Sequence, residues 1–208
     1  MYRAFDYKMM DKFGEYASVP VISGLDNLEH PCQALADMVT IKEKLGGFRG
    51  KKLVYLGDGN NVCNSLLYAS AIMGIDMIAC CPAVRMPNAE IMMKASQIAE
   101  KNGSKIIASH EPKEACKDAD VLYTDTWVSM GDSTPVEDAI KLFHDYQINS
   151  ELLSLAKPTC IVMHCLPAHR GQEITDEVIE GPQSVIFDQA ENRLHAQKAV
   201  LYTLMKDQ

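Results

Sequence analysis

From residue 51 onward, short apolar runs alternate with segments of helical periodicity, and this alternation limits the chain to few folds. The apolar runs of strand length lie at residues 53–56, 75–80, 105–108, 121–124, 159–163 and 185–187. A closing helix is expected over residues 192–205. Strands separated by helices pair in parallel through right-handed crossovers. We therefore expect an α/β fold, a doubly wound parallel sheet with helices on both faces, over roughly residues 46–190.

The residues before this region do not fit the alternation. A helix is predicted over residues 6–17 and a short strand over residues 19–22. A further helix begins at Pro31, because proline at the first helical position is preorganised for a helix, and it ends at Gly46. These elements are expected to be the remnant of a second α/β domain at the N-terminus.

The composition favours small-molecule chemistry. Hydrophobic residues make up 47% of the 208 residues, enough for one to two domains with a real core. The net charge of −8, without a basic block, argues against a nucleic-acid partner. No apolar run reaches the roughly 18 residues of a membrane span, and the first residues lack the apolar core of a signal peptide. A membrane partner is therefore not expected.

The cysteines indicate a reducing environment. There are seven, an odd number without a CxxC pair, so neither a disulfide framework nor a zinc ribbon is indicated. Reduced thiols in a cytoplasmic protein fit this pattern best.

One cysteine occupies a position that suits chemistry. His164 and Cys165 follow the predicted strand 159–163, and Pro167 and Gly171 then shape a loop. In an open parallel sheet, ligands bind outside the carboxyl ends of the strands, so these side chains mark a candidate reactive site. The alternative is that Cys165 is a small buried thiol and His164 a satisfied core histidine.

The predicted strand 53–56 is followed by residues 57–61 (Gly-Asp-Gly-Asn-Asn), which imitate the start of a dinucleotide fingerprint. The third glycine is absent, with Val62 in its place, and the next strand lacks the terminal Asp or Glu that binds a ribose. A dinucleotide cofactor is therefore not expected. Asn61 either directs its amide at a polar ligand, or Asn60 and Asn61 serve only as turn and cap residues.

Another candidate group follows the predicted strand 121–124. Asp125 places a carboxylate at the strand end, where it can receive an ammonium group. Gly131 and the turn-rich residues 132–135 predict a mobile loop that can close over a substrate. Trp127, the only tryptophan, is expected to be a packing anchor rather than a ligand contact.

Two predicted helix starts carry groups suited to an anion. His30 and Gln33 are three residues apart, so both are expected to project together from a helix N-terminus, which favours an anion. Arg193, in the first turn of the closing helix, opposes the helix dipole, which suggests a phosphate or carboxylate partner. The alternatives are an N-cap histidine with an exposed glutamine, and an ordinary solvated arginine.

Five motifs occur in one order along the chain. They are His-Pro-Cys-Gln at 30–33, Gly-Asp-Gly-Asn-Asn at 57–61, Asp-Thr-Trp-Val-Ser-Met-Gly at 125–131, His-Cys-Leu-Pro-Ala-His-Arg-Gly at 164–171 and Glu-Asn-Arg-Leu-His-Ala-Gln-Lys-Ala at 191–199. Together they resemble the ornithine carbamoyltransferases of the aspartate/ornithine carbamoyltransferase family. The resemblance implies a Rossmann-like sheet and transfer of a carbamoyl group from carbamoyl phosphate to the side-chain amine of ornithine, giving citrulline and phosphate in arginine metabolism. It implies no cofactor and no metal.

The resemblance also implies a role for each motif residue. The implied catalytic residues are His30, which polarises the carbamoyl oxygen, Cys165 and Arg193. The implied carbamoyl-phosphate site comprises Arg3, His30, Gln33, Cys165, the carbonyl of Leu166, and Arg193. The implied ornithine site comprises Asn61, Asp125, Ser129 and Met130. Catalysis in this scheme is positioning and oxyanion stabilisation, without a covalent intermediate.

The sequence departs from the family in one respect. Family members carry an upstream Ser-x-Arg-Thr-Arg motif that cradles phosphate, whereas arginine occurs here only at positions 3, 49, 85, 170 and 193. We therefore expect a truncated chain, weakly active or inactive alone, without most of the domain that forms the family's homotrimer. The expected parts are a remnant of the carbamoyl-phosphate domain at 1–29, an interdomain helix at 30–45, an ornithine-binding domain at 46–190 and a returning C-terminal helix at 191–208.

Other functions stay open on the sequence. Putrescine carbamoyltransferase is the nearest rival, although Ser-Met-Gly at 129–131 and Leu-His-Ala-Gln at 194–197 favour ornithine. A non-catalytic amino-acid-binding or interaction module is the second, because the arginine motif is absent. A dinucleotide-dependent oxidoreductase is the weakest, given the glycine pattern.

Overall fold

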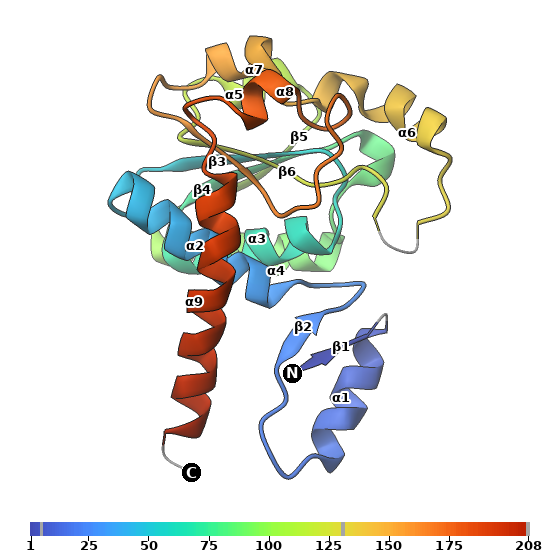
Figure 1. Cartoon of the computed structure of the whole chain (residues 1–208), viewed down its shortest axis with the longest axis vertical. Coiled ribbons are helices and arrows are strands. Elements are labelled where there is room, and N and C mark those ends of the chain that lie inside the picture. The colour runs from blue at the N-terminus through green and yellow to red at the C-terminus, as the bar shows by residue number, and fades with distance from the viewer. Residues whose placement is uncertain (5, 130–131, 207–208) are drawn as a thin grey trace.

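Five strands form the central sheet of the computed structural model, which describes residues 1–4, 6–129 and 132–206. They are β3 (Lys52–Leu56), β4 (Asp76–Cys80), β5 (Ile106–Ser109), β6 (Val121–Thr124) and β7 (Ile161–His164). Their spatial order is β5-β4-β3-β6-β7, and every neighbouring pair is parallel (Figure 1). β3 lies at the centre of the sheet; β4 and β5 follow on one side of it, and β6 and β7 then follow on the other. This order confirms the predicted doubly wound sheet.

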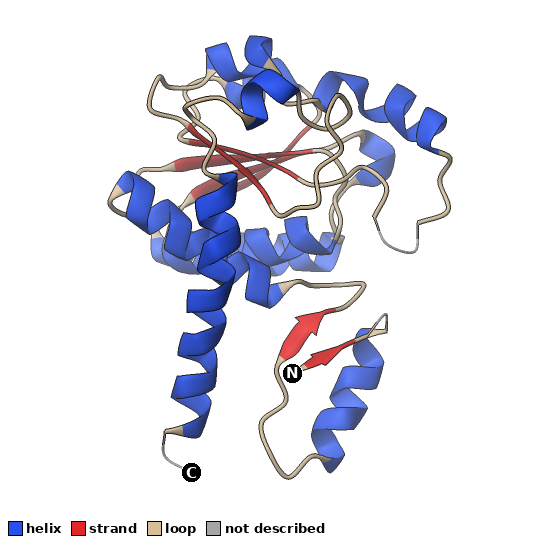
Figure 2. Cartoon of the chain, viewed as in Figure 1, coloured by secondary structure: helices blue, strands red, loops and turns tan. Residues whose placement is uncertain are grey.

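Side chains of the sheet alternate between two buried cores. In β3, Leu53 and Tyr55 pack into one core, while Val54 and Leu56 pack into the other. The first core is covered by α2 (Pro31–Leu45), α3 (Asn61–Met73) and α4 (Ala89–Asn102). The second is covered by α5 (Pro112–Cys116), α6 (Val136–Phe143), α7 (Ser150–Leu155) and α8 (Asp176–Ile179). Figure 2 shows the sheet enclosed between these two helical layers.

A smaller parallel unit precedes the sheet. In it β1 (Tyr2–Arg3) pairs with β2 (Ser23–Leu25), and α1 (Tyr7–Tyr16) connects them. Asp6 caps α1, because its side chain accepts a hydrogen bond from the backbone N–H of Lys8 at 3.0 Å. The helix predicted over residues 6–17 is therefore confirmed.

The strand predicted at residues 19–22 is wrong, because pairing occurs at Ser23–Leu25 instead. Pro20 lies inside the predicted segment and has no N–H to donate to a strand ladder. The partner strand Tyr2–Arg3 has only two residues and carries no sequence pattern that marks it.

The strand predicted at residues 185–187 is also wrong, because the closing helix α9 (Ile186–Met205) begins there. The buried positions of α9 recur at helical spacing, and two of them are polar, which hid the helical period in the sequence. These buried positions are Ile186, Gln189, Asn192 and Ala196.

Helix α9 packs along α2 and runs past the sheet to the level of the N-terminal unit (Figure 1). The amide of Asn192 joins the two helices, since it donates to Thr40 Oγ1 at 3.1 Å and to Glu43 Oε2 at 2.8 Å. Among the described residues, no helix combines the length and apolar character that crossing a membrane requires.

Candidate active site

A cavity of about 660 Å³ opens where the strand order reverses, at the carboxyl ends of β3, β6 and β7. Side chains from the N-terminal unit form its opposite wall. Open parallel sheets bind their ligands in such a crevice. The predicted site residues on its wall are Arg3, His30, Asn61, Asp125, Ser129, Cys165 and Leu166.

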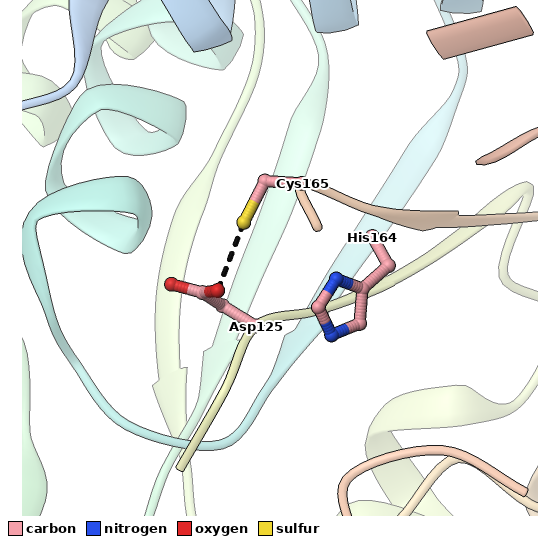
Figure 3. Close-up of side chains that lie close together, drawn as sticks. All are labelled: Asp125, His164 and Cys165. Atoms are coloured by element: carbon pink, nitrogen blue, oxygen red, sulfur yellow. Dashed lines mark hydrogen bonds between the residues drawn. The ribbon is translucent and has the colours of Figure 1, made fainter. Parts of the chain in front are cut away.

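Asp125 follows β6 and is buried. Its Oδ1 accepts a hydrogen bond from the Cys165 thiol at 2.8 Å (Figure 3) and another from the backbone N–H of Thr126 at 2.8 Å. Its Oδ2 accepts a hydrogen bond from the amide of Asn60 at 2.7 Å. A carboxylate has more acceptor sites than these three bonds occupy. Asp125 is therefore a fixed negative charge that can still receive a ligand ammonium group.

Cys165 is present as a thiol. Burial, followed by the charge of Asp125, raises the pKa of Cys165 well above its ordinary value of 9.0. The protonated sulfur donates to Asp125, as the 2.8 Å contact requires. A nucleophile would need the thiolate form, so this arrangement suits a hydrogen-bonding residue. Cys165 lines the cavity, in contrast to the other interpretation of it as a merely structural thiol.

His164 is buried, and both of its ring nitrogens have partners. Its Nδ1 accepts from the backbone N–H of Leu166 at 2.9 Å, and its Nε2 lies 3.0 Å from Glu173 Oε1, which assigns the proton to Nε2. Asp125, His164 and Cys165 place possible metal ligands within 4.8 Å of one another (Figure 3). A metal there would have to displace an existing His164 hydrogen bond, so the trio does not fit a metal centre. The alternative of a satisfied core histidine is confirmed.

Asn60 is both a helix cap and an organiser of the cavity wall. Its Oδ1 accepts from the backbone N–H groups of Val62 and Cys63 at 3.0 and 3.2 Å, which caps α3. Its Nδ2 donates to Asp125 at 2.7 Å and to the Ser129 hydroxyl at 3.1 Å. Sequence reasoning identified the cap but missed the second set of contacts. The sequence feature that could have revealed these contacts is the position of Asn60. It caps a helix directly after β3, one of the two strands between which the sheet order reverses.

Asn61 links the sheet to the N-terminal unit. Its Nδ2 donates to the backbone oxygen of Asp26 at 2.7 Å, and its side chain lines the cavity. Both interpretations of the asparagine pair therefore hold in part, with Asn60 as the cap and Asn61 at the cavity.

His30 immediately precedes α2, and its side chain does not cap that helix. Its backbone N–H donates to Ser65 Oγ at 2.8 Å. Burial, followed by the charges of Arg193 and Arg3, lowers the pKa of His30 from 6.5 to about 4. The imidazole is therefore neutral near pH 7, and its N–H can donate to a carbonyl oxygen. His30 is the N-cap residue of α2, as the alternative interpretation states, but its side chain makes no capping hydrogen bond.

Gln33 and Arg193 lie behind the wall, between α2 and α9. Gln33 is only 1% exposed, and its Oε1 accepts a hydrogen bond from Arg193 Nη1 at 2.6 Å. Neither residue lines the cavity, and the Gln33 side chain is held between Arg193 and Asp37. The alternatives of an exposed glutamine and a freely solvated arginine are wrong. The predicted residue Met130 lies outside the described residues.

The segment after β6 is held at both ends. Trp127 is buried and stacks on Phe143 with ring centroids 5.7 Å apart, which confirms it as a packing anchor. Beyond Ser129, the guanidinium of Arg85 donates to Asp132 Oδ2 at 3.1 Å and to Thr134 Oγ1 at 2.6 Å.

Two family models match the chain. Residues 49–204 match the Asp/Orn binding domain of aspartate/ornithine carbamoyltransferase, and residues 1–43 match its carbamoyl-P binding domain. The ornithine carbamoyltransferase of Methanobrevibacter smithii is 56% identical over 99% of this chain and 68% of its own length. That of Thermoplasma volcanium, described as catabolic, is 52% identical over 98% of this chain and 67% of its own length.

Solved structures agree with the sequence matches. The ornithine carbamoyltransferase from Pyrococcus furiosus superposes with a TM-score of 0.95 at 50% identity, over 98% of this chain and 65% of that chain. The enzyme from Gloeobacter violaceus gives a TM-score of 0.92 at 47% identity, over 98% of this chain and 68% of that chain. The chain therefore spans about two thirds of the length of the proteins it matches.

Proposed function

The chain belongs to the aspartate/ornithine carbamoyltransferase family, and on this premise we propose that it transfers the carbamoyl group of carbamoyl phosphate to the side-chain amine of L-ornithine. The products are citrulline and phosphate. The observation that carries the proposal is one cavity lined by both a buried carboxylate, Asp125, and a neutral imidazole, His30. The carboxylate suits the α-ammonium group of an amino acid. The imidazole N–H suits the carbonyl oxygen of a carbamoyl donor.

In the donor subsite, His30, Cys165 and Arg193 are the proposed catalytic residues. His30 donates its N–H to the carbamoyl oxygen. Arg3 and Arg193 supply positive charge for the phosphate, and both lie close enough to His30 to lower its pKa. Cys165 and the backbone carbonyl of Leu166 orient the carbamoyl nitrogen and carbon. Both line the cavity at the end of β7, which supports this role.

In the acceptor subsite, Asp125 receives the α-ammonium group of ornithine. The amide of Asn61 and the hydroxyl of Ser129 face the same cavity and offer polar partners for the amino acid. Met130, which lies outside the described residues, completes the proposed subsite by its place in the motif. An acceptor with both an α-amino and a carboxylate group uses these partners better than a simple diamine does.

The reaction requires the uncharged side-chain amine of ornithine. The amine nitrogen attacks the carbonyl carbon, the new C–N bond forms, and the carbonyl oxygen becomes an oxyanion that the His30 N–H stabilises. The C–O bond to phosphate then breaks, phosphate leaves with the bonding electrons, and the departing phosphate accepts the proton that the new amide nitrogen loses. Cys165 keeps its proton throughout, because its pKa is raised. It acts as a ligand and not as a nucleophile.

The chain spans about two thirds of the length of its relatives, so this activity is proposed for the enzyme as a whole. The proposed organisation keeps residues 1–29 with the carbamoyl-phosphate domain and residues 46–190 with ornithine binding, joined by helices at 30–45 and 191–208. Family matches at 1–43 and 49–204 support a division near residue 46. A homotrimer, as in the family, is the proposed assembly. Seven free cysteines support a reducing, cytoplasmic location.

Calorimetry and a citrulline assay on the purified chain test the proposal. We expect ornithine to bind at least about tenfold more tightly than putrescine, since putrescine lacks the groups that Asp125 and its neighbours recognise. The variant Asp125→Asn should remove most of this preference. Because the chain alone is expected to be weakly active, ligand binding is the deciding measurement and citrulline formation adds direct support. Ornithine binding without any binding of carbamoyl phosphate would favour a non-catalytic amino-acid-binding module. Failure to bind either ornithine or carbamoyl phosphate would contradict the proposal.

A further inference from the structure

A buried carboxylate that the mechanism above does not use lies behind the donor subsite. Asp37, in α2, is 0% exposed. Its Oδ1 accepts hydrogen bonds from the side-chain amides of Gln33 and Gln189, each at 2.8 Å, and its Oδ2 accepts one from the Tyr123 hydroxyl at 3.1 Å. These three donors are also buried. One carboxylate therefore joins α2, α9 and β6 in the interior.

Each of the two glutamines also accepts a hydrogen bond from a group at or next to the site. Gln33 Oε1 accepts from Arg193 Nη1 at 2.6 Å. Gln189 Oε1 accepts from the backbone N–H of His164, the residue before Cys165, at 2.9 Å. The Asp37 carboxylate is therefore linked through Gln33 to the Arg193 guanidinium, and through Gln189 to the end of β7, where Cys165 follows.

The orientation of both amides follows from hydrogen-bond chemistry. An ionised carboxylate only accepts hydrogen bonds, whereas a guanidinium and a backbone N–H only donate them. A glutamine amide between two such groups must turn its nitrogen to the carboxylate and its oxygen to the donor. Asp37 therefore determines which way Gln33 and Gln189 point.

The charge state of Asp37 is compatible with this role. Burial raises the pKa of Asp37 from 3.8 to about 7, while hydrogen bonds from Gln33, Gln189 and Tyr123 and the charge of Arg193 oppose the rise. The carboxylate is ionised in mildly alkaline solution, and all of its hydrogen-bonding neighbours are donors there.

We propose that Asp37 is a positioning residue that holds the Arg193 guanidinium in place for carbamoyl phosphate, through the amide of Gln33. The inference rests on the proposed function, because that function gives Arg193 its ligand. Without the carboxylate, no acceptor holds the amide nitrogen of Gln33, so its oxygen is no longer fixed toward Arg193. A reversed amide would set its N–H groups against the guanidinium N–H groups and displace Arg193.

The first test is the nearly isosteric variant Asp37→Asn, measured at about pH 8.5, where the wild-type carboxylate is ionised. At the Oδ1 position, which accepts from both glutamines in the wild type, the new NH₂ group faces donors and takes the neighbouring oxygen of Gln33 from Arg193. We expect the affinity for carbamoyl phosphate to fall about tenfold or more, as loss of a charge-assisted contact does. The guanidinium NMR signals of Arg193, assigned by Arg193→Lys among few arginines, should broaden or shift.

A matched control is Asp120→Asn. Asp120 is also a buried carboxylate, but it lies at the amino end of β6, where it bonds to Lys157 Nζ at 2.8 Å and to the backbone N–H of Lys52 at 2.9 Å. Loss of the Asp120 carboxylate should destabilise the fold, but at a place distant from the site. The Arg193 signals and the affinity for carbamoyl phosphate should therefore stay as in the wild type.

The double variant Asp37→Asn with Gln33→Glu exchanges the carboxylate and the amide. With the NH₂ of the new amide in the place of Oδ1, it can donate to the carboxylate at position 33, and that carboxylate can accept from Arg193. The amide oxygen, in the place of Oδ2, can still accept from Tyr123, and Gln189 keeps its hydrogen bond to the Tyr123 hydroxyl at 3.1 Å. We expect the Arg193 signals to return in this variant. It keeps the test decisive even where the single variant fails to fold, because a double variant without ordered Arg193 signals would overturn the proposal.

The outcomes separate this inference from the proposed function. Unchanged Arg193 signals in Asp37→Asn would overturn the inference, and so would altered signals with unchanged affinity for carbamoyl phosphate. A wild-type chain that does not bind carbamoyl phosphate would contradict the proposed function instead. In that case the Arg193 signals in the single and double variants still decide whether Asp37 positions the guanidinium.

Discussion

The side-chain amide nitrogen of Asn60 lies 2.7 Å from Asp125 Oδ2, while the oxygen of the same amide caps α3. One side chain thus fixes both the start of a helix and the direction of a carboxylate on the neighbouring strand end. Asn60 and Asp125 follow β3 and β6, the two strands between which the sheet order reverses. The fold therefore builds the acceptor subsite directly at its topological switch.

This relationship predicts that Asn60→Asp separates the two roles. Aspartate caps a helix about as well as asparagine, so stability should change by less than about 1 kcal/mol from the cap itself. The new carboxylate, however, faces Asp125 and cannot donate to it, so we expect ornithine affinity to fall about tenfold or more. Calorimetry measures the affinity and urea denaturation the stability.

The control for this prediction is Asn149→Asp, since Asn149 caps α7 in the same way, by accepting from the backbone N–H of Leu152. That variant should leave ornithine affinity unchanged. Equal ornithine affinities in Asn60→Asp and the wild type would show that the amide of Asn60 does not organise the subsite.

Cys165 should react slowly with alkylating reagents. Burial and the charge of Asp125 raise the pKa of Cys165, so little thiolate exists at pH 8. We expect the iodoacetamide rate at Cys165, followed by mass spectrometry, to keep rising beyond about pH 9, the ordinary midpoint for a thiol. Asp125→Asn removes the repelling charge and should speed the reaction at pH 8. A plateau below pH 8 in the wild type would refute the assignment of Cys165 as a thiol donor.

His30 should stay neutral well into the acidic range. Burial, Arg193 and Arg3 lower the pKa of His30 to about 4, so its imidazole NMR signals should titrate near pH 4 and not near 6.5. Arg3→Gln should raise that midpoint. A His30 midpoint near 6 would mean that the donor subsite carries a cationic imidazole in mildly acidic solution.

The same pKa has a consequence for stability. The folded state keeps His30 neutral, whereas the unfolded chain binds a proton near pH 6.5. The contribution of His30 to stability is therefore complete above pH 6.5 and is lost as the pH falls towards 4. Urea denaturation should show a smaller loss between pH 7 and pH 4.5 in His30→Gln than in the wild type. An equal loss in both proteins would contradict the lowered pKa.

The sheet was predictable because its apolar runs are short, regularly spaced and separated by helices. The residues that follow β3, β6 and β7 could be placed together for the same reason, since parallel strands end at one edge. Asn61, Asp125 and Cys165 do line one cavity. Local capping was also readable, as Asp6 at α1 demonstrates.

What the sequence could not reveal depends on interior contacts between distant segments. Gln33 was expected to face a ligand beside His30, but the Arg193 guanidinium and the buried Asp37 carboxylate, both distant from any local pattern, hold its side chain in the interior. Asp37 looks like an ordinary helix-surface aspartate until α9 and β6 bury it. The start of α9 was missed because the polar residue Gln189 occupies a core position.

Gly59 should be intolerant of any side chain. A Cβ there would overlap the backbone of residues 85–87, and the Gly59 N–H donates to the Arg85 carbonyl at 2.9 Å. Backbone atoms cannot yield as a flexible side chain can, so we expect Gly59→Ala to lower the free energy of unfolding by about 2 kcal/mol or more. Gly47→Ala is the control, because its Cβ would meet no atom within 4 Å. Because Asn60 is the next residue, Gly59→Ala should also weaken ornithine binding. If urea denaturation found the two alanine variants equally stable, the close contact between the loop after β3 and residues 85–87 after β4 would not be needed for stability.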